Sequence, residues 1–325
     1  MPESAPRIRI ATRSSQLALW QSNHVAELIR RTAPDCRVEL VEVSTQGDQD
    51  RTSTLASMGG QGVFTKEVQA AVLDGRADVA VHSLKDLPTL PVDGLVLAAV
   101  PQRASALDAL ILPVSREPTQ QSEAGGGSAD VSLLDELPDG AKIGTGSPRR
   151  QAQLRHFRND LDVLQIRGNV ETRLARLDAG EYDAIVLAEA GLGRLNFGHR
   201  ISMPLVPPVM LGAVGQGAIG VECRADDAAV CGTISRMSDP GTFLAVRAER
   251  SLMRELEAGC HAPVGVRSEI NGTELRLDSV VLSLDGEIRI VASDAGVTAS
   301  PEELGKRVAG LLCAEGAEAL LRPHT

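Results

Sequence analysis

The chain has 325 residues and carries 43 acidic residues against 33 lysines and arginines, a formal net charge of -10 at pH 7. Repulsion from phosphate backbones, with only one Trp, one Tyr and four Phe for stacking on bases, argues against a nucleic-acid partner. The N-terminus has no apolar leader, no run approaches the about 18 apolar residues of a membrane span, and the five cysteines lack metal-ligand spacing. We therefore expect a cytoplasmic protein with no membrane association and no metal.

Apolar runs that alternate with helical patterns predict mainly parallel α/β sheets in the first two thirds of the chain. The predicted strands are 7–11, 38–43, 77–83, 94–100, 109–114, 141–145, 161–166 and 183–188. The first helix should follow Ser15, because Leu17, Trp20, His24 and Leu28 recur at helical spacing. A further helix should begin at Ser147, where a capping serine precedes a proline.

The remaining segments have a different character. Residues 115–130 lack periodicity and are rich in Ser, Gln and Gly, which predicts a flexible surface insertion. A helix around 242–258 should end at Gly259, and a meander with a hairpin turn at Asp285-Gly286 should follow it. Capping-box spacing after Ser300 predicts a last helix.

Four polar clusters follow predicted strands, at the edge where parallel sheets bind ligands. They are Thr12 to Ser15, His82 to Asp86, Thr145 to Arg150, and Arg167 to Asn169 with Arg173 one turn later. Helix N-termini and arginine side chains both bind carboxylates, so the clusters predict a cleft for a small ligand with several carboxylates. Taken singly, each arginine is as well explained by a solvated surface position.

Residues 144–174 concentrate this charge, with six arginines against three acidic residues. Arg155 and Arg158 have no place in the clusters, and we expect them to be solvated. Asp86 is the only carboxylate in the four clusters and is the candidate for proton transfer, although a Lys-Asp pair is more often a solvated turn. His82 is expected to be a core histidine. Cys260, in a loop, is a candidate nucleophile or attachment point.

Eight segments, in family order, resemble the hydroxymethylbilane synthases, also called porphobilinogen deaminases. They are RIATRSSQLALWQ, STQGD, GVFTKEV, ADVAVHSLKDLP, GTGSPRRQAQLR, IRGNVETRLARLDAGEYDAIVLAEAGLGRL, AVGQGAIGVECR and LEAGCHAPVG. The resemblance implies a transferase that joins four porphobilinogen molecules head to tail, releases ammonia, and hydrolyses the product to hydroxymethylbilane for porphyrin and haem biosynthesis. It also implies a dipyrromethane cofactor, held by Cys260 through a thioether.

By the same resemblance, Asp86 would hydrogen-bond pyrrole N–H groups, stabilise the cation formed at deamination and assist proton transfer. Other residues match positions that bind cofactor or substrate, or that lie near the cleft and hinge: Arg13, Ser15, Gln21, Ser83, Lys85, Thr145, Ser147, Arg149, Arg150, Arg167, Gly168, Arg173, Arg194 and Gln216. The sequence departs from the family pattern at Ser57 and Gln61, where lysines are common, at 104–110, where only Asp108 of an Asp-Pro-Arg-Asp run remains, and at Glu189.

The resemblance implies a monomer with two type II periplasmic-binding-protein-like α/β domains and a small C-terminal α+β domain. The predicted domains are 1–105 with 215–237, then 106–214, then 238–325 with the cofactor cysteine. An alternative is a non-enzymatic module of the same two-domain architecture that binds or senses a small polyanion, because fold does not determine function. A cysteine-dependent hydrolase is a weaker alternative, since no histidine is paired with Cys260 in the sequence.

Overall fold

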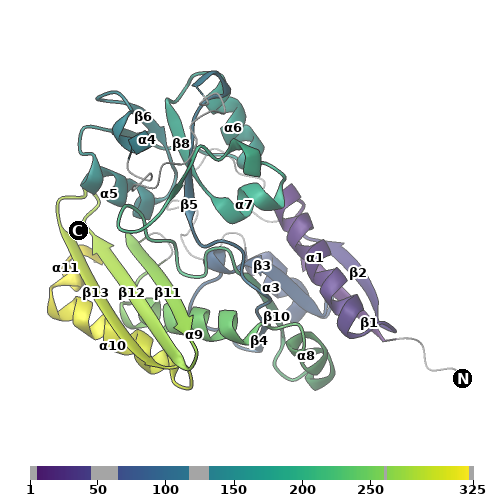
Figure 1. Ribbon diagram of the computed structural model, residues 1–325. Helices are drawn as coiled ribbons and strands as arrows, with labels where there is room; N and C mark the ends of the chain where they lie inside the picture. The colour runs from purple at the N-terminus through teal and green to yellow at the C-terminus, as the bar shows by residue number, and fades with distance from the viewer. Residues whose placement is uncertain (1–5, 45–64, 117–131, 260–261, 322–325) are drawn as a thin grey trace, which may run out of the picture.

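A computed structural model describes residues 6–44, 65–116, 132–259 and 262–321 (Figure 1). The chain forms three units, each built on one sheet, and Figure 1 shows the third unit beside the other two. Cys260, Ser57, Gln61 and nearly all of the predicted insertion lie outside the described residues. No helix within the described ranges is long and apolar enough to cross a bilayer.

Unit 1 is a five-stranded sheet in the order β2-β1-β3-β10-β4. Its strands are β1 (Arg7–Thr12), β2 (Arg37–Glu42), β3 (Val79–Ser83), β4 (Leu95–Ala99) and β10 (Ile219–Arg224). Its helices are α1 (Gln16–Thr32), α3 (Lys66–Leu73) and α8 (Ala228–Ser235). Strand β3 alternates between two cores, since Val79 and Val81 pack with α1 and α8 while Ala80 packs with α3.

Unit 2 repeats this pattern in the order β7-β6-β8-β5-β9. Its strands are β5 (Asp108–Ile111), β6 (Lys142–Gly144), β7 (Asp162–Leu164), β8 (Ala184–Ala188) and β9 (Met203–Leu205). Its helices are α4 (Ser132–Asp135), α5 (Pro148–Phe157), α6 (Val170–Asp178) and α7 (Glu189–Arg194). Two 3-10 turns, Val114–Arg116 and Gly198–Arg200, complete it.

Each sheet contains one antiparallel strand, and in both cases that strand follows a crossover between the units. β5 enters unit 2 after the first crossover, residues 100–107, and runs antiparallel to β8 and β9. β10 enters unit 1 after the return crossover, residues 206–218, and runs antiparallel to β3 and β4. The other pairs within the two sheets, such as β1 with β2 and β6 with β7, are parallel. The predicted fold class is therefore confirmed, although β9 and β10 were not among the predicted strands.

Unit 3 is the antiparallel meander β11 (Val264–Asn271), β12 (Glu274–Leu282) and β13 (Arg289–Val297). Helices α9 (Pro240–Glu255) and α10 (Pro301–Ala314) share its core with the short α11 (Ala317–Leu321). The predicted helices and hairpin are present, and the turn residue Gly286 has φ +82°. The residue boundaries predicted for the three domains stay a prediction.

Two details of the predicted helix ends are wrong. Helix α9 ends at Glu255 rather than beside Gly259, because Glu257 adopts a left-handed conformation with φ 49°. The amide of Ala258 donates to the carbonyl of Met253 at 3.1 Å, which closes the helix in a Schellman-type turn. At the start of α10 the Ser300 side chain makes no capping hydrogen bond, so the predicted capping box does not form.

The carboxylate of Glu249, in the middle of α9, joins unit 3 to both crossovers. It is fully buried and accepts hydrogen bonds from Nη1 and Nη2 of Arg103 in the first crossover, at 2.6 and 3.2 Å. It also accepts from the amide of Gly215 in the return crossover at 2.7 Å, and from Oγ of Ser268 at 2.6 Å. Nε of Arg103 donates to the carbonyl of Gln216 at 2.6 Å, so the two crossovers are tied directly to each other.

Helix α5 contacts unit 3 through Arg155, whereas Arg158, just after the helix, contacts other segments of unit 2; we expected both to be solvated. Nη1 of Arg155 donates to the carbonyl of Leu284 in the β12–β13 hairpin at 2.8 Å. Arg158 donates to the carbonyl of Leu134 at 2.8 Å and pairs with Asp160 at 2.7 Å. The expectation that Arg155 and Arg158 are solvated is therefore wrong, because both side chains satisfy backbone carbonyls of neighbouring segments. The helix that carries the predicted binding arginines is thus held from outside the cleft.

Candidate active site

Lys85 and Asp86 are presented by η1 (Leu84–Asp86), a 3-10 turn directly after β3. Leu84 is fully buried and packs with Ala218 of the return crossover and Val246 of α9, which holds the turn in place. Asp86 is exposed and Lys85 is half-buried. The buried leucine thereby places an amine and a carboxylate side by side at the carboxyl end of the strand, as predicted for a ligand site.

The amine of Lys85 is a cation that the protein stabilises incompletely. Nζ donates a 3.4 Å hydrogen bond to Oε1 of Gln216. Burial and repulsion from Arg150 lower the pKa of Lys85 to about 8, against the attraction of Asp86 and Asp108. A ligand carboxylate beside Nζ would favour the charged form and would raise this pKa again.

Asp108, the first residue of β5, binds three predicted site residues to one buried carboxylate. Its Oδ2 lies 2.7 Å from Nη1 of Arg149. Its Oδ1 accepts from Nε and Nη2 of Arg150, at 2.9 and 2.7 Å, and from Nε2 of Gln216 at 2.9 Å. Burial alone would raise the pKa of Asp108, but the two guanidinium groups hold it well below its usual range. The carboxylate is therefore charged, and it fixes the orientation of both arginines.

The two arginines of α5 differ in what they offer to a ligand. Arg150 directs Nε and Nη2 to Asp108 and Nη1 to the carbonyl of Val186 at 3.0 Å. Arg149 pairs with Asp108 and donates to the carbonyl of Leu211, and burial lowers its pKa. Arg150 therefore contributes mainly charge, whereas Arg149 also lines the cavity described below.

A second cationic group gathers at the start of α6. Gly168 has φ +107°, and a Cβ there would lie 2.7 Å from Cγ2 of Thr172, so the turn requires glycine. The Gly168 carbonyl accepts from Nε of Arg173 at 2.8 Å. Burial, together with repulsion from Arg150 and Arg167, lowers the pKa of Arg173 to about 10. Guanidinium groups that lie close enough to repel one another are suited to bind an anion with several charges.

The predicted residues of α1 and β3 support the site from unit 1. Oγ of Ser15 caps α1 by accepting from the amide of Ala18 at 3.3 Å. Gln21 is buried, and its Nε2 donates to Oγ of Ser83 at 2.8 Å, which ties α1 to the end of β3. Arg13 follows β1 and is half-buried. The first contact confirms that α1 begins after a capping Ser15, and the second gives Gln21 and Ser83 a supporting role that the sequence alone did not indicate.

The loop before α5 is closed by its own side chains. Thr145 is buried, and its Oγ1 accepts from the amide of Ser147 at 3.3 Å while its carbonyl accepts from Nε2 of Gln151 at 3.1 Å. Ser147 is the N-cap of α5, with a proline after it as predicted, but its hydroxyl makes no capping hydrogen bond. This leaves the Ser147 side chain lining the cavity instead.

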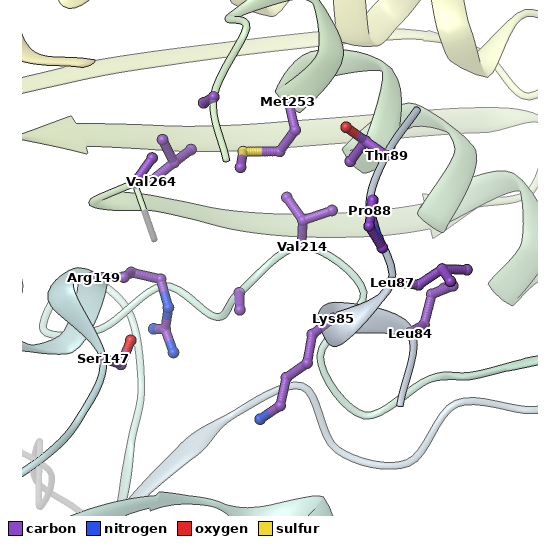
Figure 2. Close-up of a pocket in the computed structure, with 13 residues that line it drawn as sticks. Leu84, Lys85, Leu87, Pro88, Thr89, Ser147, Arg149, Val214, Met253 and Val264 are labelled. Carbon is purple, nitrogen blue, oxygen red and sulfur yellow. The ribbon is translucent and has the colours of Figure 1, made fainter. Parts of the chain in front are cut away.

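A small, partly open cavity lies where the three units meet (Figure 2). Its lining comes from η1 and the segment after it, from α5 and the return crossover, and from unit 3: Leu84, Lys85, Leu87, Pro88, Thr89, Ser147, Arg149, Ala213, Val214, Met253, Ala258, Ala262 and Val264. Figure 2 shows the amine of Lys85 and the guanidinium of Arg149 below the apolar side chains of Val214 and Met253. Such a mixed lining suits a ligand with both rings and carboxylates.

Two departures from the family pattern meet beside the site. Oγ of Ser105, in the segment that lacks the usual Asp-Pro-Arg-Asp run, donates to Oε2 of Glu189 at 2.5 Å. Glu189 begins α7, and its amide donates to the carbonyl of Leu107 at 3.1 Å. The acidic residue therefore contacts the altered crossover segment, so the two departures lie against each other.

Two family models match the chain. Residues 8–232 match the porphobilinogen deaminase domain that binds the dipyrromethane cofactor, and residues 243–314 match the porphobilinogen deaminase C-terminal domain. A porphobilinogen deaminase from Nostoc sp. is 45% identical over 314 residues, covering 97% of this chain and 93% of the relative. The chain belongs to the porphobilinogen deaminase family. A second family member, from Stenotrophomonas maltophilia, is also 45% identical and is covered over 98% of its length.

This membership confirms the predicted family, the predicted transferase class and hydroxymethylbilane synthase activity, and the predicted dipyrromethane cofactor. It does not favour the alternative of a non-enzymatic binding module. Among solved structures, the effector-binding domain of BenM with benzoate matches at a TM-score of 0.41 and 16% identity, covering 72% of this chain and 91% of that domain.

The structure brings four predicted residues together around Asp108: Lys85, Arg149, Arg150 and Gln216. Cys260 lies outside the described residues, so its role stays a prediction. Sequence reasoning did not identify Asp108 as a site residue. A signal was available, because a charged residue at the start of the apolar run ALIL must be paired when it is buried. The apolar lining residues, such as Met253, gave no such signal.

Removal of the Asp108 charge should destabilise the fold strongly. Asp108→Asn leaves two buried guanidinium groups without a counter-charge, so we expect the free energy of unfolding to fall by about 3–5 kcal/mol in urea denaturation. Asp160→Asn is the matched control, because Asp160 pairs with Arg158 at an exposed position and should matter much less. Equal unfolding midpoints for the two variants would contradict the central role of Asp108.

Proposed function

We propose that this chain makes hydroxymethylbilane from porphobilinogen in the cavity between the three units, with Asp86, Cys260 and the surrounding cations as the working residues. The observation that carries this proposal is the composition of that cavity. It joins two cationic side chains, Lys85 and Arg149, to an apolar wall, and its lining includes Ala258 and Ala262, which flank the Cys260 loop in sequence.

The surroundings of the cavity fit the cofactor expected for the family. Dipyrromethane consists of two pyrrole rings with carboxylate side chains, so it needs apolar contacts and cations together. Val214, Met253 and Val264 offer the apolar contacts, and Lys85 and Arg149 offer the cations. When bound, the cofactor supplies the pyrrole carbon to which the first substrate is joined. Cys260 would hold it as an anchor, because a thiol adds to the electrophilic methylene left when porphobilinogen loses ammonia.

Asp86 is proposed to stabilise positive charge on the substrate and to transfer protons. Its carboxylate is exposed at the end of η1, next to Lys85, so a ligand can reach it. A carboxylate at this point would accept hydrogen bonds from pyrrole N–H groups and stabilise the cation formed from the substrate at deamination. Proton transfer to the leaving ammonia is the second role that its exposed position allows.

The remaining cations are proposed to bind the carboxylates of the substrate and of the growing product. Each added pyrrole brings an acetate and a propionate, so the ligand becomes more negative at every step. Arg149 and Lys85 lie at the cavity, while Arg173 and Arg167 lie at the start of α6 and repel each other. Neighbouring cationic groups of this kind give successive positions for carboxylates. The predicted monomeric state and cytoplasmic location stay predictions.

The cofactor assignment can be tested by intact mass. Cys260→Ser should lack the added mass of a dipyrromethane and should lose activity, because serine does not form the thioether. Cys313→Ser, which changes a half-buried cysteine in α10, is the control and should keep both mass and turnover. After incubation with porphobilinogen, the unmodified chain should show a ladder of bound intermediates. Normal holoenzyme mass in Cys260→Ser would remove the anchor role, and an absent ladder would favour the binding-module alternative.

Asp86→Asn should separate chemistry from binding. The variant keeps the shape of the side chain but cannot carry the negative charge, so we expect kcat to fall by about 10²–10⁴-fold while the holoenzyme mass is retained. Asp93→Asn, an exposed carboxylate in the same unit, should leave kcat unchanged. A near-normal kcat in Asp86→Asn would exclude the proposed proton role.

The lowered pKa of Lys85 predicts an alkaline limb in the pH profile. Because burial lowers the pKa of Lys85 to about 8 in the free enzyme, its amine loses its charge as the pH rises through that value. Carboxylate binding needs the charged form, so kcat/KM should fall above about pH 8. Lys85→Arg keeps its charge throughout this range and should move the limb to higher pH. An unchanged profile in Lys85→Arg would show that another group titrates.

A further inference from the structure

Helix α1 carries an aromatic pair on a face that does not belong to the core. Its buried residues are Gln21, Ser22, Val25, Ala26 and Ile29, whereas Trp20 is 38% exposed. The Trp20 ring stacks on the ring of His24, with centroids 5.1 Å apart and planes 14° from parallel. Trp20 and His24 therefore lie on a face of α1 that points away from the hydrophobic core and contacts another part of the protein.

That contact is with Arg194 of unit 2. The guanidinium carbon lies 5.5 Å from the centroid of the Trp20 ring, within the range of a cation–π interaction. Nη2 of Arg194 donates to the carbonyl of Gly217 at 2.7 Å. Burial lowers the pKa of Arg194 to about 10, and no carboxylate within the described ranges pairs with it. The side chain is therefore a half-buried cation that the protein neutralises with neither Asp nor Glu in those ranges.

The hydrogen-bond partner of Arg194 is itself immobilised. Gly217 has φ +82° in the return crossover, and a Cβ there would lie 2.4 Å from the carbonyl oxygens of Ala104 and Ser105. Its carbonyl also accepts from the amide of Ala104 at 3.1 Å. One N–H of Arg194 is thus held by the return crossover, and one face of its guanidinium group lies against the Trp20 ring of unit 1.

We propose that Trp20, with His24 stacked against it, is a positioning residue that orients the Arg194 guanidinium to bind a carboxylate of the pyrrole substrate. The proposal rests on the proposed function. Within the described ranges, the contacts of Arg194 occupy one face and one N–H of a group that has five N–H donors, so the other donors are left for a ligand. A flat ring is the suitable support, because it holds the guanidinium without consuming its hydrogen bonds.

The first test is a comparison of kinetic constants. Trp20→Leu should raise KM for porphobilinogen by about 3- to 10-fold with little change in kcat, and Trp20→Phe should give a smaller rise because it keeps a ring face. In an Arg194→Gln background, Trp20→Leu should add no further rise in KM, since the partner is already gone. Phe157→Leu, which removes a ring of similar exposure (37%) from α5, is the control and should leave KM unchanged.

A second readout is available because Trp20 is the only tryptophan of the chain. Titration with porphobilinogen should change its fluorescence in the wild type and much less in Arg194→Gln. An equal change in both, or additive effects of Trp20→Leu and Arg194→Gln on KM, would overturn the proposal. A variant that is only less stable, with unchanged KM, would also overturn it. Intact mass of the wild type tests the proposed function separately, because a ladder of intermediates there does not depend on Trp20.

Discussion

The site depends on the burial of one negative charge. A carboxylate leaves water at great cost unless cations and hydrogen-bond donors surround it, and Asp108 meets that requirement with Arg149, Arg150 and Gln216. Two arginines against one aspartate leave one positive charge, and the nearby Lys85 adds to it. The pairing therefore positions the arginines and still leaves the cleft cationic in a chain whose net charge is -10.

A second buried carboxylate connects this cleft to the rest of the molecule. Glu249 binds Arg103 and Gly215, one from each crossover, and lies on the helix that precedes the Cys260 loop. Any change of angle between units 1 and 2 must bend the crossovers, and Glu249 ties both of them to unit 3.

The cations of the cleft are held in place without being fully neutralised. Lys85, Arg173 and Arg194 all have lowered pKa values, with burial as the main cause in each. In the unbound site, burial therefore disfavours the charged forms of these side chains, and the carboxylates of a ligand would stabilise them. Among the described residues, backbone carbonyls, an amide side chain and an aromatic ring make the direct contacts to these groups, which keeps their charge available for binding.

The sequence by itself determined the local features, because strand periodicity, helix starts and the motifs around Asp86 and Arg149 depend on neighbouring residues. It predicted eight strands that the structure contains, and it predicted the family, while the roles of the candidate site residues stay predictions. Only the tertiary structure decided how they combine. The roles of Asp108 and Glu249, the contacts of Arg155, and the pairing of Trp20 with Arg194 all join residues far apart in the chain. Pairing, burial and electrostatic repulsion are properties of such long-range contacts, so a local pattern indicates at most that Asp108 needs a partner and not which residues supply it.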